Sequence, residues 1–152
     1  MKRISRLETL FPPFANLVRQ GLMNCNAHGI PLRAFETYRS WERQESLYAQ
    51  GRTEPGQKVT NARAGESWHN YGLAVDLVLM IDGKWTWNHT ELYKKAPIYF
   101  EPLGLEWLGR SKRFPELVHY QFPTSFTISS AKGLAKKGGG ILSVWNEILK
   151  VI

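Results

Sequence analysis

Ionisable side chains interrupt two apolar segments of this chain, and no other feature of the sequence restricts the possible folds as strongly. Residues 67–76 lead into an apolar run, and residues 116–120 open a second one. Runs of this length and composition predict β-strands. An unpaired carboxylate buried in such a run, as expected for Asp76, costs several kcal/mol unless it is neutralised, paired or bound to a cation. The fold must therefore bring a partner to this strand.

Two histidines, one in each segment, are suitable partners for that carboxylate. His69, Asp76 and His119 supply two imidazoles and one carboxylate, which are ligand types that zinc accepts. Three protein ligands leave a fourth position for water, as in catalytic zinc sites. Glu116, three residues before His119, is a candidate acid/base. A buried His–Asp ion pair is the alternative interpretation of the first segment, and a loop charge is the alternative for Glu116.

A reaction at such a site also needs a positive group or a donor for the developing oxyanion, and Arg39 is the candidate. It lies at the end of an expected strand, directly before the expected helix N-cap Ser40. The alternative is a surface arginine paired with Glu36 or Glu42. Ser67 is a candidate for a hydrogen-bond donor that orients a metal ligand. The alternative is a serine that only forms part of a turn.

The spacing of apolar residues and turn signals predicts a mixed order of helices and strands. The expected helices and strands are, in chain order, helix 12–26, strand 32–38, helix 40–50, strand 72–81, strand 84–87, helix 88–100, strands 103–107 and 117–122, and helices 129–137 and 141–149. This order predicts an α+β fold, with a small, mostly antiparallel sheet flanked by helices. We expect one domain over residues 1–152, with a helical tail from 124 to 152 packed on it.

Composition narrows the function classes. The chain has 152 residues, a net charge of +7 and a pI near 9.7, which implies attraction to an anionic polymer or surface. The basic residues are scattered along the sequence, so there is no long basic tract that would indicate nucleic-acid binding. We expect no disulfide, because Cys25 is the single cysteine, and no membrane insertion or signal peptide. These features predict a protein made in the cytoplasm.

The motifs resemble those of a known family. The pattern Ser67-x-His69-x-x-Gly72-x-Ala74-x-Asp76, followed by Glu116-x-x-His119, is similar to the M15 zinc peptidases. Segments 38–53, which include Gln44, and 59–62 resemble the L-alanyl-D-glutamate endopeptidase branch, so the resemblance covers about residues 30–122. It implies Zn²⁺ bound by the two histidines and Asp76, with Glu116 as catalytic base. It places Arg39 at the substrate or oxyanion, and Gln44 behind these groups or at the substrate.

We therefore expect a monomeric, zinc-dependent hydrolase of peptidoglycan that cuts the L-Ala–D-Glu bond of stem peptides. A phage endolysin, which waits in the cytoplasm and acts on the wall after release, fits this expectation. The anionic wall polymer is a second expected partner of the basic surface. The alternatives are a D-Ala-D-Ala carboxypeptidase or dipeptidase, a non-catalytic wall-binding module and, with least support, a nucleic-acid-binding domain.

Overall fold

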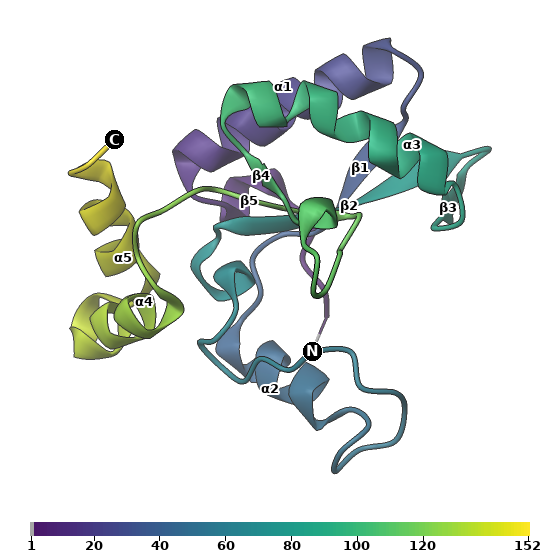
Figure 1. The fold of residues 1–152 in the computed structure, drawn as a ribbon. Coiled ribbons are helices and arrows are strands. Elements are labelled where there is room, and N and C mark those ends of the chain that lie inside the picture. The colour runs from purple at the N-terminus through teal and green to yellow at the C-terminus, as the bar shows by residue number, and fades with distance from the viewer. Residues whose placement is uncertain (1) are drawn as a thin grey trace.

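A five-stranded antiparallel sheet organises the chain, and β2, Ala74–Ile81, is its central strand. A computed structural model describes residues 2–152 (Figure 1). The strands follow the order β1-β2-β5-β4, and β3 pairs with the far end of β2. The other strands are β1 Leu32–Glu36, β3 Lys84–Thr86, β4 Glu106–Trp107 and β5 His119–Gln121. The expected α+β fold with a small antiparallel sheet is confirmed.

One face of the sheet carries the hydrophobic core. Helix α1, Pro12–Ala27, covers this face, and prolines occupy its first two positions, where no intrahelical N–H bond is lost. Alternation along β2 sends every second side chain into the core. The core includes Phe11, Phe14, Val18, Leu73, Val75, Leu77, Leu79 and Tyr120, all buried. Asp76 has the opposite phase and therefore lies on the other face of the sheet.

The other face is partly covered by α2, Trp41–Ala49, and by the long loop that follows it (Figure 1). Ser40 caps α2 as expected, because its hydroxyl accepts a hydrogen bond from the Arg43 backbone N–H at 3.1 Å. The space between this layer and the sheet contains the functional groups described below.

The region between β3 and β4 differs from the expectation of one helix over 88–100. Helix α3 spans only Thr90–Lys95, and two 3-10 turns, Ala96–Tyr99 and Glu101–Leu103, replace its second half and the start of the strand expected at 103. Pro97 and Pro102 explain the change, because proline lacks the N–H that a continuing helix needs and clashes with the preceding turn. The helix also begins later than expected, since His89 is its N-cap residue.

The C-terminal residues form two helices, α4 Ile128–Leu134 and α5 Gly140–Leu149, on either side of a wide turn. Gly138, with φ of 125°, breaks the helix in that turn. The Trp145 indole N–H donates to the Tyr71 carbonyl at 2.7 Å, and its ring packs 5.7 Å from that of Phe11. No helix within residues 2–152 is long and apolar enough to cross a bilayer.

Candidate metal centre and active site

Three carboxylate and imidazole side chains lie in one row across neighbouring strands. Asp76 on β2 pairs with His119 on β5 and, on its other side, with Glu36 on β1. The pairing of β1 and β2 shifts between Ala34 and Glu36, so Phe35 is an extra residue in a β-bulge. A bulge re-aims the side chains that follow it, and here it sets Glu36 opposite Asp76.

His69 reaches the same point from a 3-10 turn, Trp68–Tyr71, directly before β2. Ser67 caps this turn by accepting the His69 backbone N–H at 3.3 Å, and the Asn70 side chain accepts the Ser67 backbone N–H at 3.2 Å. Gly72 ends the turn with φ of 66°, a conformation that favours glycine. Ser67 therefore contributes through the backbone of the turn that carries His69.

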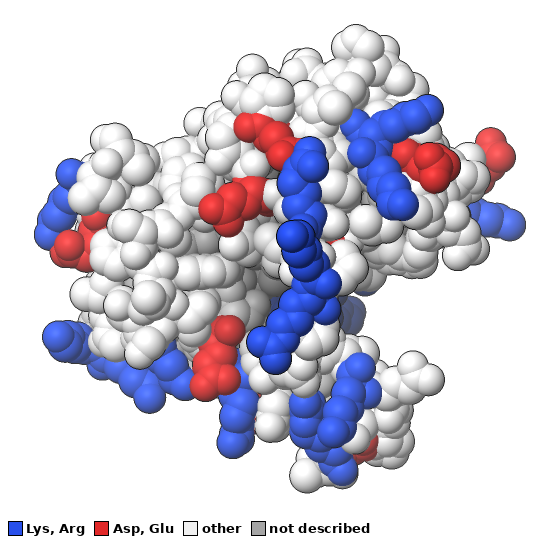
Figure 2. Space-filling model, viewed as in Figure 1, with Lys and Arg blue, Asp and Glu red and all other residues white. Residues whose placement is uncertain are grey.

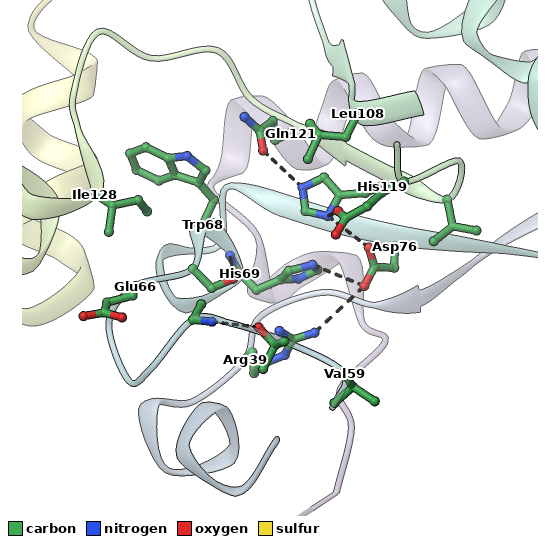
Figure 3. Close-up of a pocket in the computed structure, with 15 residues that line it drawn as sticks. Arg39, Val59, Glu66, Trp68, His69, Asp76, Leu108, His119, Gln121 and Ile128 are labelled. Carbon is green, nitrogen blue, oxygen red and sulfur yellow. Dashed lines mark hydrogen bonds and ion pairs between the residues drawn. The ribbon is translucent and has the colours of Figure 1, made fainter. Parts of the chain in front are cut away.

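The three expected ligands converge. One donor atom from each of His69, Asp76 and His119 lies within 4.8 Å of the other two. Nε2 of His69 is 3.3 Å from Oδ2 of Asp76, and Nδ1 of His119 is 3.1 Å from Oδ1 (Figure 3). Both rings are buried, whereas the Asp76 side chain is 19% exposed at the bottom of a cleft.

The ring nitrogens that face away from Asp76 have carbonyl acceptors. Nδ1 of His69 is 2.8 Å from the Thr37 carbonyl, and Nε2 of His119 is 3.1 Å from Oε1 of Gln121. The Gln121 amide nitrogen in turn donates to Glu106 at 3.1 Å, which keeps Oε1 toward the ring. In neutral imidazoles these outer nitrogens are the N–H donors, so the inner nitrogens present lone pairs to the carboxylate.

Lone pairs that face a carboxylate repel it unless a cation lies between them. Nε2 of His69 is buried without a hydrogen-bond partner, which is costly for a polar atom. The set of two imidazoles and a carboxylate, each outer nitrogen hydrogen-bonded, is the arrangement that divalent metals such as zinc use in proteins. The residues present therefore fit a metal ion.

The electrostatics of the row indicate the same need for positive charge. Burial by itself would raise the pKa of Asp76, but the neighbouring imidazoles outweigh it and hold the pKa below its usual range. Burial would lower the pKa of His119, but its hydrogen bond and charge interaction with Asp76 raise the pKa overall. Both directions show that positive charge beside Asp76 is favoured.

Glu116 lies beside this centre on the loop before β5. Its Oε2 is 3.5 Å from Nδ1 of His119, and its side chain is 53% exposed at the cleft. It can reach a molecule bound in the cleft without being buried, which suits an acid/base group.

Arg39 also reaches the cleft, held by partners on two sides. Its Nη2 donates to Glu36 at 2.6 Å, and its Nη1 donates to Gln44 at 3.1 Å. Nη2 is also 3.9 Å from Oδ2 of Asp76. The pairing with Glu36 that the sequence offered as an alternative is thus present, and Arg39 lines the cleft as well.

Gln44 is fully buried and is not among the described residues that line the cleft. It contacts Arg39 and the loop residues Thr60 and Ala62. Its amide nitrogen donates to the Ala62 carbonyl at 2.8 Å, which ties the long loop to α2. Of the two roles expected for Gln44, the structure is compatible with the indirect one.

The cleft has a volume of about 470 Å³, within the usual range for ligand sites. It runs between the loop residues 59–62 on one side and the loop before β5 on the other, with the donor row at its base (Figure 3). Sequence reasoning did not identify Thr60, Trp68, Leu108, Val118, Gln121 and Ile128, which also line it. Gln121 could have been found, because it is the next residue on the same face of β5 as His119.

The basic side chains of the visible face do not form a single patch (Figure 2). Figure 2 shows Lys and Arg in several groups on the visible face, one of them crossing the hollow in the middle of the molecule. Arg110, Lys112 and Arg113, on the loop before β5, are exposed. Such a surface favours a ligand with negative charge.

Comparisons with known proteins show what this chain is similar to. A family model described as VanY, D-alanyl-D-alanine carboxypeptidase, matches residues 9–99, which include His69 and Asp76. The chain is 40% identical over 102 residues to the peptidoglycan L-alanyl-D-glutamate endopeptidase CwlK of Bacillus subtilis, and the match spans 61% of each protein.

Solved structures share the fold. The L-Ala D-Glu endopeptidase ChiX of Serratia marcescens matches with a TM-score of 0.59 and 23% identity, over 77% of this chain and 83% of that one. A D,D-pentapeptidase VanY from the VanB-type resistance cassette, in complex with Zn(II), matches with a TM-score of 0.53 and 18% identity, over 88% and 81%. With more than half of its residues matched by the family model, the chain belongs to the VanY family of peptidases, in agreement with its resemblance to M15 enzymes.

Proposed function

We propose that this chain is a zinc-dependent peptidoglycan hydrolase that cuts the L-Ala–D-Glu bond of stem peptides. The observation that carries the proposal is the convergence of His69, Asp76 and His119 at the base of an open cleft, with Glu116 beside them. The similarity to CwlK supports the choice of bond.

In this proposal the two histidines and Asp76 hold the zinc. Bound there, zinc supplies Lewis acidity, which polarises a peptide carbonyl and makes water acidic enough to lose a proton near neutral pH. Glu116 accepts the proton of the attacking water and passes it to the leaving amine. Arg39 contributes positive charge where the carbonyl oxygen becomes negative. Gln121 and the Thr37 carbonyl keep the imidazoles in the correct tautomers.

A D-Ala-D-Ala carboxypeptidase is the second candidate, because the matching family model has that description. Such an enzyme must hold the terminal carboxylate of its substrate, which usually requires a cation. Arg39 is the single Lys or Arg among the described residues that line the cleft, and Glu36 already pairs with it. This lining favours cleavage within the peptide over removal of its last residue.

Digestion of purified peptidoglycan, with the products identified by mass spectrometry, tests the proposal. The zinc-loaded protein should create new N-terminal D-glutamate, and a chelator should prevent this until zinc is restored. Loss of terminal D-alanine instead would assign the chain to the carboxypeptidases. Absence of cleavage by folded, zinc-loaded protein would contradict the enzymatic function and leave a wall-binding module, which co-sedimentation with intact walls would detect.

The setting in which the chain acts is a further part of the proposal. We place it in the cytoplasm as a monomeric lysin that acts on the wall after release and binds its anionic polymers through the basic surface. Neither membrane insertion nor nucleic-acid binding is part of this proposal. Cells expressing the chain should lyse when their inner membrane is permeabilised from outside and stay intact otherwise. Lysis without permeabilisation would contradict this placement.

A further inference from the structure

Two carboxylates face each other across strands β1 and β2. The bulge at Phe35 sets Glu36 directly opposite Asp76, and the side chain of Glu36 is only 5% exposed. Like charges opposite each other in a sheet repel, and this repulsion is stronger when water is excluded. A cation must therefore lie between these two carboxylates.

The guanidinium of Arg39 occupies that place, but it lies closer to the Glu36 carboxylate than to that of Asp76. Its Nη2 is 2.6 Å from Oε2 of Glu36 and 3.9 Å from Oδ2 of Asp76. The first distance is a charge-assisted hydrogen bond and the second is not a hydrogen bond. The interaction with Glu36 therefore determines where Arg39 lies.

Glu36 and Gln44 together hold the guanidinium of Arg39. Arg43 donates to the other Glu36 oxygen at 2.6 Å, which orients the carboxylate toward both arginines. Gln44 Oε1 accepts a hydrogen bond from Nη1 of Arg39 at 3.1 Å, and its amide nitrogen donates to the Ala62 carbonyl. This network is built from buried or half-buried side chains, so its geometry is well defined.

Arg39 approaches an oxygen of Asp76 that also faces an expected metal ligand. Oδ2 of Asp76 is 3.3 Å from Nε2 of His69 and 3.9 Å from Nη2 of Arg39. A closer Arg39–Asp76 ion pair would use the lone pairs of Oδ2 and place positive charge beside the ion. Arg39 and a divalent cation therefore compete for Asp76.

We propose that Glu36 is a positioning residue that holds Arg39 away from Asp76 and so keeps this carboxylate available to the metal. The inference rests on the metal centre of the proposed function. Without the charge of Glu36, the nearest carboxylate for Arg39 is Asp76. Metal affinity then falls although no ligand has changed.

The test is the zinc affinity of purified variants, measured by competition with a chromophoric chelator, so no turnover is involved. Glu36→Gln keeps the shape but removes the charge, and should weaken zinc binding roughly 10–100-fold, the usual effect of losing a residue that supports a metal ligand. The double variant Glu36→Gln/Arg39→Gln removes the competitor and should bind zinc nearly as tightly as the native chain. Circular dichroism and thermal melting report whether each variant is folded.

Glu45→Gln is the matched control, since Glu45 also pairs with an arginine, Arg63, but at an exposed site. It should leave zinc affinity unchanged. Arg39→Gln alone should bind zinc at least as tightly as the native chain, and this variant decides the question if Glu36→Gln does not fold.

Three results would overturn the inference: unchanged zinc affinity in a folded Glu36→Gln variant, a double variant as weak as the single one, or weaker binding by Arg39→Gln. The native protein in the same titration reports on the metal centre separately. If the native chain binds no zinc, both the proposed metal centre and this inference are wrong. If the native chain binds zinc but does not cut peptidoglycan, only the proposed reaction is wrong.

Discussion

The two histidines of the site use different nitrogens toward Asp76, Nε2 from His69 and Nδ1 from His119. The difference follows from where each acceptor lies, since the Thr37 carbonyl takes one ring nitrogen and the Gln121 amide oxygen takes the other. Each imidazole is thus oriented by a hydrogen bond on its outer nitrogen before any metal binds. This reduces the conformational freedom that is lost when the metal binds.

Glu116 provides the prediction that separates binding from chemistry. Glu116→Gln should lower the rate of peptide cleavage about 10²–10⁴-fold, the usual contribution of a general base, because the amide cannot accept the proton. Zinc content, measured by elemental analysis, should stay at the native level, since Glu116 is not among the three ligands. Near-native cleavage by this variant would exclude Glu116 as the base.

Cys25 gives a second prediction at the scale of one residue. It is fully buried in the core, and burial raises the pKa of its thiol to about 12. The thiolate is the reactive form, so a disulfide reagent should not label the folded chain and should label it fully in guanidinium. Rapid labelling of the native protein would show that this part of the core opens, or that the packing around α1 is wrong.

At the scale of elements, the turn that carries His69 depends on Gly72. Its φ of 66° disfavours other residues, and an added Cβ would lie 3.0 Å from the Thr9 carbonyl oxygen. Gly72→Ala should therefore lower the free energy of unfolding by about 1–2 kcal/mol.

The measurement for Gly72→Ala is the urea midpoint, with Gly83→Ala as the control. Gly83 also has positive φ, 72°, but its Cβ would meet no atom within 4 Å. Equal losses in both variants would show that the backbone conformation, and not the contact with Thr9, accounts for the effect.

A comparison of the expected helices and strands with the observed ones shows how much of the structure could be predicted from the sequence. The central strand, the α2 helix with its Ser40 cap and the convergence of the two histidines and Asp76 followed from apolar spacing and residue type. The helix expected over 88–100 was wrong, because Pro97 lacks the backbone N–H that would continue the helix, although the apolar pattern runs on past it.

The Thr37 carbonyl and the pairing of Glu36 with Asp76 could not be predicted from the sequence, for a different reason. The Thr37 acceptor is a backbone carbonyl, which any residue could supply, and its position depends on tertiary contacts. The bulge at Phe35, which sets Glu36 opposite Asp76, depends on how β1 and β2 align, and register within a strand pair is not determined by either strand alone.

For the whole molecule, the C-terminal helices are joined to the domain near the site. Trp145 connects α5 to the turn of His69 through the Tyr71 carbonyl and to the core through Phe11. Trp145→Ala should cost roughly 2–3 kcal/mol of unfolding free energy, less than the loss for a fully buried aromatic residue, because Trp145 is half-buried.

Chemical denaturation followed by circular dichroism measures the effect of Trp145→Ala. Leu142→Ala on the same helix is a suitable control, since Leu142 is 58% exposed and should change stability by less than about 0.5 kcal/mol. A Trp145→Ala variant as stable as the native chain would mean that α5 does not support the domain.

The central claim is that His69, Asp76 and His119 hold one divalent ion, and anomalous diffraction at the zinc edge from crystals of the zinc-loaded chain tests it most directly. The account predicts one strong peak among Nε2 of His69, a carboxylate oxygen of Asp76 and Nδ1 of His119, at bonding distance from all three. A zinc ion bound elsewhere, or no peak at this position in crystals soaked with zinc, would contradict the account.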